Sequence, residues 1–467
     1  MKTTSRLIAT ITTLIVVLIS ACGRNPLPTT DAGVATDAQS PDTFVILEDG
    51  SIPLMDDMKS PDSMSTPDIT PHPPALPVCN GLKTMATPVM PEKAVFLGIH
   101  GGKSSFALNL LQYKPSAPNG FPQPTEDHGR WLTFDKGQLG SGKFDANEGI
   151  LMAVDQTKNE FLAMGVKYKP DYKTVEWESV YRLNSNGKLL QKGFVTPISH
   201  EAMQDSYNEL FSTDHGVLFA RSVIKTLPNS TKQDQVEIYH LSLPPTTMLA
   251  TIPPITPNSK KESPIGVNAI TTHQNQVILA TVFHATDDEL KWVVSLYDLP
   301  SKTTKWTTIL FNDKDVPKKP ILSYWGRVNK IWVQNNQIKL FWKGSSNSFT
   351  MVSTTYITTY DMNGKFQSTH QLPNGVEDIV PIKEGYVAVL FEHKAWKEVS
   401  IALLDDKQGK IMANTLSKLG SCTSCNDLSS YAGYKPRLAM VNNQVAVAWS
   451  EGSIGRMFYL NVFQCLP

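Results

Sequence analysis

The sequence has no excess of charge of either sign, since 43 Lys and Arg residues balance 43 Asp and Glu residues in a chain of 467. The balance is uneven along the chain: residues 23–78 contain nine acidic and two basic residues, which leaves 39 basic against 34 acidic residues in 79–467. A nucleic-acid-binding protein concentrates more positive charge than this. We therefore exclude nucleic acid as a partner. The 41% of apolar residues is enough to build a packed core.

The linear motifs of common hydrolases and metal sites are also missing. The chain has no G-x-S-x-G elbow and no H-E-x-x-H pair. Its single C-x-x-C, at Cys422 and Cys425, has no second pair to complete a four-ligand zinc site. The segment 101–104, Gly-Gly-Lys-Ser, ends like a phosphate-binding loop, but Leu97 replaces the first glycine of that motif, so we interpret it as a turn. The sequence thus predicts no metal and no cofactor.

Long apolar runs are absent, and the longest near the N-terminus, Leu14–Ile19, is too short for a transmembrane helix of about 20 residues. It follows Lys2 and Arg6 and precedes small residues, which is the pattern of a secretory signal. The four residues 19–22, Ile-Ser-Ala-Cys, resemble the lipobox of bacterial lipoproteins.

The lipoprotein resemblance implies that residues 1–21 are a signal peptide and that Cys22 carries the lipid, including palmitate, after cleavage. A plain signal peptide with an incidental cysteine is the alternative. Gly23, where Asp would favour the inner membrane, favours the outer membrane. We therefore expect a protein anchored by lipid in the bacterial cell envelope.

Residues 22–78 are rich in proline and acidic residues, with ten of the 32 prolines of the chain in residues 23–78. The triplets at 40–42, 60–62 and 66–68 read Ser/Thr-Pro-Asp and recur without helical or strand periodicity. Such a composition buries too little apolar surface to offset the entropy cost of ordering. This predicts a disordered tether between the lipid and the domain at 79–467.

Residues 79–467 contain a recurring unit of an apolar stretch, a polar turn with Gly or Asn, and an alternating apolar strand. Aligned on one turn residue in each copy, the spacings are 56, 67, 60, 61, 49 and 58 residues. The aligned residues are Lys93, Gly149, Gly216, Gln276, Gln337, Tyr386 and Gln444. A regular period of this length is typical of repeat architectures.

A second hairpin follows most copies, marked by turns such as Asn186-Gly187 and Asn363-Gly364 between apolar runs. Four strands in each of seven units predict an all-β fold that resembles a seven-bladed β-propeller. Two packed β-sandwich domains are the alternative. The resemblance is architectural, because the Trp-Asp and paired-glycine signatures of known propeller families are missing. It therefore implies nothing about activity.

The remaining four cysteines predict two disulfide bonds in an oxidising compartment. The last repeat supplies about three strands, and residues 81–90 could add the missing outer strand beside Val462 and Phe463. That pairing would bring Cys79 close to Cys465 and close the ring. Cys422 and Cys425 then pair locally.

A binding or catalytic site of a propeller forms from loops that meet at one rim. We expect the ends of the second strands to lie on one rim, and they supply the binding candidates His100, His284, Lys343, Glu392, His393 and Glu451. The same strand ends also carry Asp155, Gln156 and Arg221. Histidine and glutamate side chains on one rim can bind a metal or act as acid–base groups. The alternative is an ordinary solvated rim, because strand ends in soluble proteins are usually polar.

Five tryptophans, at 131, 177, 292, 306 and 396, lie beside expected strands. They either stack on sugars or fill the spaces between blades. We expect a binding or scaffold module for an envelope protein or glycan. The alternative is an extracytoplasmic hydrolase or lyase that acts on a glycan.

Overall fold

The computed structural model divides the chain into two units, Met1–Asp68 and Ile69–Pro467. The residues that the structure describes all belong to the second unit. They are 76–85, 95–111, 129–135, 138–144, 150–168, 175–193, 209–213, 216–226, 232–241, 247–252, 264–286, 289–310, 327–345, 353–392, 398–412, 415–421, 436–451 and 457–467.

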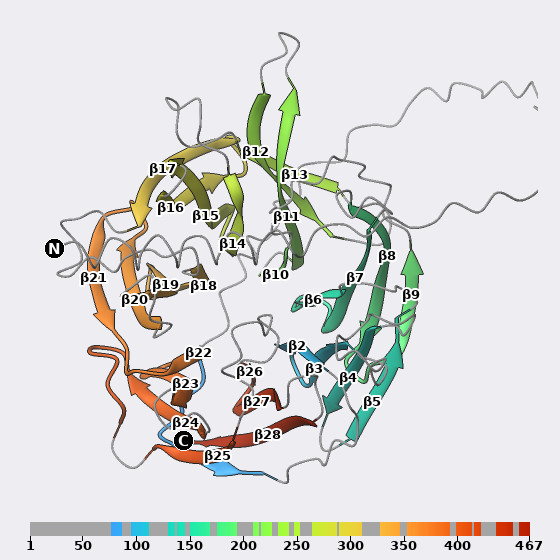
Figure 1. Ribbon diagram of the computed structural model, residues 1–467, viewed down its shortest axis with the longest axis vertical. Helices are drawn as coiled ribbons and strands as arrows, with labels where there is room; N and C mark the ends of the chain where they lie inside the picture. Colours follow the sequence, from blue (N-terminus) through green and yellow to red (C-terminus); the bar gives the residue numbers. More distant parts are fainter. Residues whose placement is uncertain are drawn as a thin grey trace, which may run out of the picture. The chain divides into compact units, whose positions relative to one another are not determined.

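Within these residues, 28 strands form seven antiparallel four-stranded sheets arranged as blades in a ring (Figure 1). We number the blades in chain order and call their strands A to D, outward from the axis. The predicted seven-bladed β-propeller is thus confirmed, and the two-sandwich alternative is wrong. The described part of the chain contains no helix, and therefore none long and apolar enough to cross a membrane.

The first four blades follow one another along the chain. Blade 1 comprises β2 (Val95–Gly101), β3 (Phe106–Leu111), β4 (Gly129–Asp135) and β5 (Gln138–Lys143). Blade 2 comprises β6 (Ile150–Asp155), β7 (Glu160–Tyr168), β8 (Val175–Asn184) and β9 (Leu189–Gly193). Blade 3 comprises β10 (Glu209–Thr213), β11 (Gly216–Thr226), β12 (Lys232–His240) and β13 (Thr247–Ile252). Blade 4 comprises β14 (Pro264–His273), β15 (Gln276–Thr286), β16 (Glu289–Asp298) and β17 (Thr303–Leu310).

The last three blades complete the ring. Blade 5 comprises β18 (Arg327–Gln334), β19 (Gln337–Ser345), β20 (Ser353–Asp361) and β21 (Phe366–Gln371). Blade 6 comprises β22 (Val376–Ile382), β23 (Gly385–Glu392), β24 (Glu398–Asp405) and β25 (Ser417–Ser421). Blade 7 takes β26 (Arg437–Val441), β27 (Gln444–Glu451) and β28 (Met457–Leu466) from the end of the chain and its D strand, β1 (Gly81–Thr84), from the beginning.

The ring closes where these two ends of the domain meet. Strand β1 pairs antiparallel with β28, with Gly81 opposite Leu466 and Thr84 opposite Phe463. Cys79 and Cys465 form a disulfide bond next to this pairing. Both parts of the predicted closure, the outer strand and the bond, are confirmed.

Seven apolar cores fill the spaces between neighbouring blades, because each strand alternates its side chains between two buried faces. In β27, Val445, Val447 and Trp449 pack toward blade 6. Ala446 and Ala448 pack toward blade 1. Large side chains on one face and small ones on the other let twisted sheets pack closely around a ring.

Tryptophans take part in this packing, as one of the two interpretations predicts. Trp131 donates its indole N–H to the carbonyl oxygen of Gly187 in the C–D turn of blade 2, at 2.8 Å. Trp306 makes the same contact with Met362 of blade 5, at 2.9 Å. Trp292 is also buried. The side chain of Trp177 and all of Trp396 lie outside the described residues.

Candidate binding faces of the propeller

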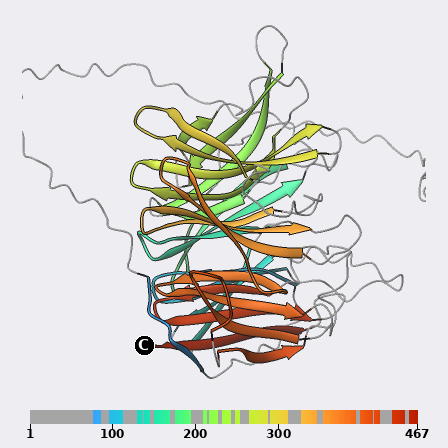
Figure 2. The ribbon, with the colours of Figure 1, turned by 90° about the vertical axis from the view of Figure 1, so that its left-hand side faces the viewer.

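The two ends of the ring differ in their connections. One end, the turn face, holds the A–B and C–D turns, which gather at the left in Figure 2. Its A–B turns include residues 102–105, 156–159, 274–275, 335–336, 383–384 and 442–443. The opposite end, the loop face, is where A strands begin and B strands end. Any site has to be assigned to one face or the other.

The candidate residues from the sequence divide between these faces. Lys343 lies near the end of β19, at the loop face, as do the backbone positions of His284, Glu392 and Glu451 in their B strands. His100, in contrast, is the penultimate residue of the A strand β2 and lies toward the turn face. The expectation that all of them share one rim is therefore wrong for His100.

Asp155 and Gln156 also lie toward the turn face and not at the loop face, because Asp155 ends the A strand β6 and Gln156 follows it. Several other residues cannot be placed further. The structure does not describe the side chains of Arg221, His284, Glu392 and Glu451. His393, Cys22, Cys422 and Cys425 lie outside the described residues. Their proposed roles remain predictions.

Lys343 is buried in an ion pair toward the loop face. Its ammonium contacts the carboxylate of Glu377 in blade 6, and the two side chains are 9% and 1% exposed. Glu377 is the extra residue of a β-bulge, because Val376 and Asp378 pair with the consecutive residues Leu390 and Val389. A bulge turns a side chain out of the regular alternation, so strand periodicity could not reveal this partner.

The next residue, Asp378, links three blades. Its Oδ1 forms an ion pair with Lys330 Nζ of blade 5 at 2.8 Å and accepts a hydrogen bond from the backbone N–H of Ile379 at 2.9 Å. Its Oδ2 accepts from the backbone N–H of Leu438 in blade 7, also at 2.9 Å. With both oxygens bonded and the residue 2% exposed, Asp378 ties the inner strands of blades 5, 6 and 7 together.

His100 lies on the inner strand of blade 1, with Nε2 at 3.4 Å from Asn109 Oδ1. Burial lowers the pKa of the imidazole to about 4, against the opposing effect of this hydrogen bond. The positive charge of Lys330 lowers the pKa further. His100 is therefore neutral at physiological pH and suits a polar packing role better than proton transfer near pH 7.

A second buried lysine joins blades 5 and 6 near the turn face. Lys339 Nζ lies 2.5 Å from Asp406 Oδ1, which also accepts the hydroxyl of Tyr386 at 2.6 Å. Burial alone would raise the pKa of Asp406, but hydrogen bonds from Lys339 and Tyr386 outweigh it and lower that pKa. Burial, with the bond to Asp406, raises the pKa of Tyr386 above its usual range.

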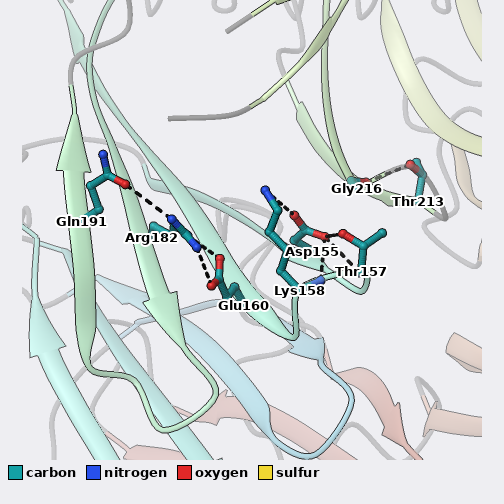
Figure 3. Close-up of polar contacts among 8 residues, drawn as sticks. All are labelled: Asp155, Thr157, Lys158, Glu160, Arg182, Gln191, Thr213 and Gly216. Carbon is teal, nitrogen blue, oxygen red and sulfur yellow. Dashed lines mark hydrogen bonds and ion pairs between the residues drawn. The ribbon is translucent and has the colours of Figure 1, made fainter. Parts of the chain in front are cut away.

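Blade 2 carries a further polar cluster near the turn face (Figure 3). Asp155, at the end of β6, accepts hydrogen bonds at Oδ1 from the backbone N–H and hydroxyl of Thr157 and thereby fixes the A–B turn. Arg182 on β8 makes a two-pronged contact with Glu160 of β7 and reaches Gln191 of β9. The bond to Glu160 raises the pKa of Arg182. These contacts hold the turns and strands of one blade in register.

The turn at residues 102–105 is clasped by both neighbouring blades. The backbone N–H of Lys103 donates to Asn159 Oδ1 of blade 2 at 2.9 Å. Asn442 Nδ2 of blade 7 donates to the carbonyl oxygen of Lys103, also at 2.9 Å. The interpretation of this glycine-rich segment as a turn is confirmed.

Most of the buried charged groups described above thus bind one another and connect strands or blades. No group of three or more histidine, cysteine or acidic residues in the described part of the chain is placed to hold a metal ion. Such an arrangement makes a rigid ring whose exposed ends can present a surface.

No family model matches the sequence, and no curated protein matches it either. Solved structures of low similarity include the polysaccharide lyase Uly1, with 8% identity, a TM-score of 0.46, and coverage of 82% of this chain and 92% of that one. The β-propeller domain of the trilobed protease from Pyrococcus furiosus has 9% identity, a TM-score of 0.43, and coverage of 80% and 99%.

BamB from Moraxella catarrhalis has 9% identity, a TM-score of 0.33, and coverage of 82% and 99%. Likeness at this level says nothing about activity. The sheet order itself assigns the described chain to the seven-bladed β-propeller fold.

Proposed function

We propose that the protein is a lipid-anchored component of the bacterial cell envelope whose propeller is a binding module for an envelope protein or glycan. The observation that carries the binding role is the mutual pairing of buried charged groups at the ring, above all Lys343 with Glu377 and Lys330 with Asp378. Groups engaged in this way stabilise the ring and leave binding by its surface as the simplest role.

The anchoring part of the proposal depends on the sequence around Cys22. Acyl chains contribute about 0.8 kcal/mol for each buried CH₂ group. The described chain enters the propeller at its turn face, where the carbonyl oxygen of Pro77 accepts the backbone N–H of Lys383 at 2.9 Å.

The anchor is tested by comparing the full-length protein with Cys22→Ser. We expect the wild type to incorporate radiolabelled palmitate and to fractionate with membranes, and the variant to lose both properties. A variant that remains in the membrane fraction would overturn the anchoring proposal.

The binding role is tested with the soluble full-length Cys22→Ser protein. Isolated envelope glycans and crosslinked envelope proteins are assayed for saturable binding, and the same glycans for new reducing ends or unsaturated products. We expect binding without product. Turnover that scales with enzyme concentration would replace the binding role with the hydrolase or lyase alternative.

A further inference from the structure

Three A–B turns on the turn face consist entirely of carboxamide residues. They are Gln274-Asn275 in blade 4, Asn335-Asn336 in blade 5 and Asn442-Asn443 in blade 7, and all six residues are exposed. We call them the carboxamide turns. Blades 4 and 5 are neighbours, so two of these turns lie side by side at one end of the ring (Figure 1).

Backbone geometry explains only part of this composition. Gln274, Asn335, Asn336 and Asn442 have φ between 52° and 57°, in the left-handed region that asparagine and glycine tolerate best. Glycine would adopt these φ values equally well, and glutamine is a poor choice there, although the carboxamide of Asn442 is also used to donate to the carbonyl oxygen of Lys103. Asn275 and Asn443 do not have positive φ, so the backbone gives no reason for their carboxamides.

Blade 6 departs from this composition. Its A–B turn is Lys383-Glu384, and this turn contacts the incoming N-terminal segment through the bond from Lys383 N–H to the Pro77 carbonyl oxygen. The backbone N–H of Asp406 also donates to the carbonyl oxygen of Glu384, at 3.3 Å. Lys383 and Glu384 are nevertheless exposed, like the turns of blades 4 and 5, so only the contact with Pro77 distinguishes this turn.

The chemistry of the carboxamide turns indicates their ligand. They carry no charge, which argues against a nucleic acid or a polyanion. The large apolar residues that are exposed in the described chain all lie outside the A–B turns, which argues against the aromatic and aliphatic anchors of a protein interface. A carboxamide offers two donors and an acceptor in one plane, which matches the hydroxyl groups of a sugar.

An aromatic side chain lies on the blade 6 side of the blade 5 turn. Trp332 lies three residues before this turn, is only partly buried, packs edge-to-face against Tyr386 of blade 6, and donates its indole N–H to Gln334 Oε1 at 3.3 Å. Partly exposed indole combines apolar surface with a polar edge. This is the combination that a pyranose ring, with its C–H face and hydroxyl rim, requires.

We propose that the carboxamide turns of blades 4 and 5, with Asn275, Asn335 and Asn336 as the principal contacts, bind an uncharged glycan. The inference rests on the proposed binding function and specifies its ligand class and its face. Asn443 of blade 7 extends the same surface beyond blade 6.

The test separates binding from turn formation. In the full-length Cys22→Ser background, the triple variant Asn275→Ser, Asn335→Gly and Asn336→Gly keeps the left-handed turn while removing three carboxamides. Its matched control is Asn186→Ala with Asn363→Ala, which removes two exposed carboxamides from C–D turns on the outer circumference of the same face. Titration calorimetry with chitohexaose, maltoheptaose and the polyanion polygalacturonate measures the affinities.

We expect a neutral oligosaccharide to bind the parent protein, and the triple variant to bind it about tenfold to a hundredfold more weakly, since each lost hydrogen bond contributes about 0.5–1.5 kcal/mol. The control should bind like the parent, and both variants should keep the parent melting temperature. Equal binding by the triple variant would overturn this site, while the binding function would stand.

Failure of both neutral oligosaccharides to bind would overturn the assignment of ligand class, and so would preference for polygalacturonate. The proposed binding function fails separately, when neither envelope glycans nor crosslinked envelope proteins bind the parent saturably.

Discussion

Cys79 and Cys465 are separated by 386 residues in the sequence, yet their Cα atoms lie 4.8 Å apart and their sulfur atoms are bonded. Both residues are buried, at 0% and 1% exposure. The bond therefore encloses almost the whole propeller in one covalent loop.

The first prediction concerns this bond. Replacing both residues, Cys79→Ser with Cys465→Ser, should lower the free energy of unfolding by about 4–5 kcal/mol, because the unfolded chain regains the entropy that a very long loop removes. Urea unfolding, followed by tryptophan fluorescence, measures the difference. Wild-type protein treated with reductant should unfold at the same urea concentration as the variant. Equal unfolding midpoints for the oxidised wild type and the variant would contradict the prediction.

The second prediction concerns Asp378. Asp378→Ala should lower the free energy of unfolding by about 2–4 kcal/mol, because it leaves the buried N–H of Leu438 without its acceptor and removes the carboxylate partner of the Lys330 ammonium, which still donates to the carbonyl oxygen of Ile379. Chemical denaturation gives the value. Lys305→Ala, which removes the exposed partner of Asp298, is the control and should change stability little. Similar losses in the two variants would show that Asp378 does not tie the blades.

The third prediction concerns the pH dependence that His100 contributes. The folded protein keeps this imidazole neutral down to its pKa of about 4, whereas the unfolded chain takes up the proton near pH 6.5. Between these pH values the unfolded state binds more protons than the folded state. The free energy of unfolding is therefore not reduced by His100 above about pH 6.5, and it falls as the pH decreases toward 4. His100→Gln should flatten this part of the stability curve.

Histidine NMR resonances give a direct measurement for comparison. The His100 signal should not shift between pH 8 and pH 5, whereas histidine in the urea-unfolded protein should titrate near pH 6.5. A His100 midpoint near 6.5 would show that burial does not control this residue.

The fourth prediction concerns Gly364 in the C–D turn of blade 5. Its φ of +78° is unfavourable for a side chain, and an added Cβ would lie 2.6 Å from the indole of Trp306. Gly364→Ala should therefore destabilise the protein by about 1–3 kcal/mol. The control Gly81→Ala adds a Cβ at an ordinary 3.5 Å from Leu466. The melting temperatures of both variants are measured by thermal unfolding. A Gly364→Ala variant with the wild-type melting temperature would mean that the indole moves aside without loss of stability.

The A–B turns of blades 4 to 7 join their strands through two residues, and such short turns make the repeat recognisable in the sequence. Asn335-Asn336 and Asn442-Asn443 show how left-handed asparagine marks such turns. Blades 1 and 2 use the longer connections 102–105 and 156–159, which do not read as two-residue turns even though left-handed Asn159 ends the second one. Their A strands were therefore matched to the B strands of other blades, and His100 was assigned to the wrong end.

The candidate sites were less predictable than the fold. Lys343 could be selected because it lies at a strand end, but its partner Glu377 is a bulge residue from the next blade. Contacts between blades depend on how twisted sheets pack, and a repeat period carries no information about that packing. The closing disulfide was predictable because it follows from a missing strand.

The position of the disulfide also decides how the propeller responds to mechanical tension. Cys79 precedes β1, so a pull on the N-terminal segment reaches the sulfur bridge before it reaches the four residue pairs of Gly81–Thr84. Force then passes into Cys465 at the end of β28, and β1 stays paired. Without the bridge, the same pull would act on those short hydrogen-bonded pairs and detach β1 from the sheet. The force that the attachment withstands is therefore set by the covalent disulfide bond and not by the hydrogen bonds between β1 and β28.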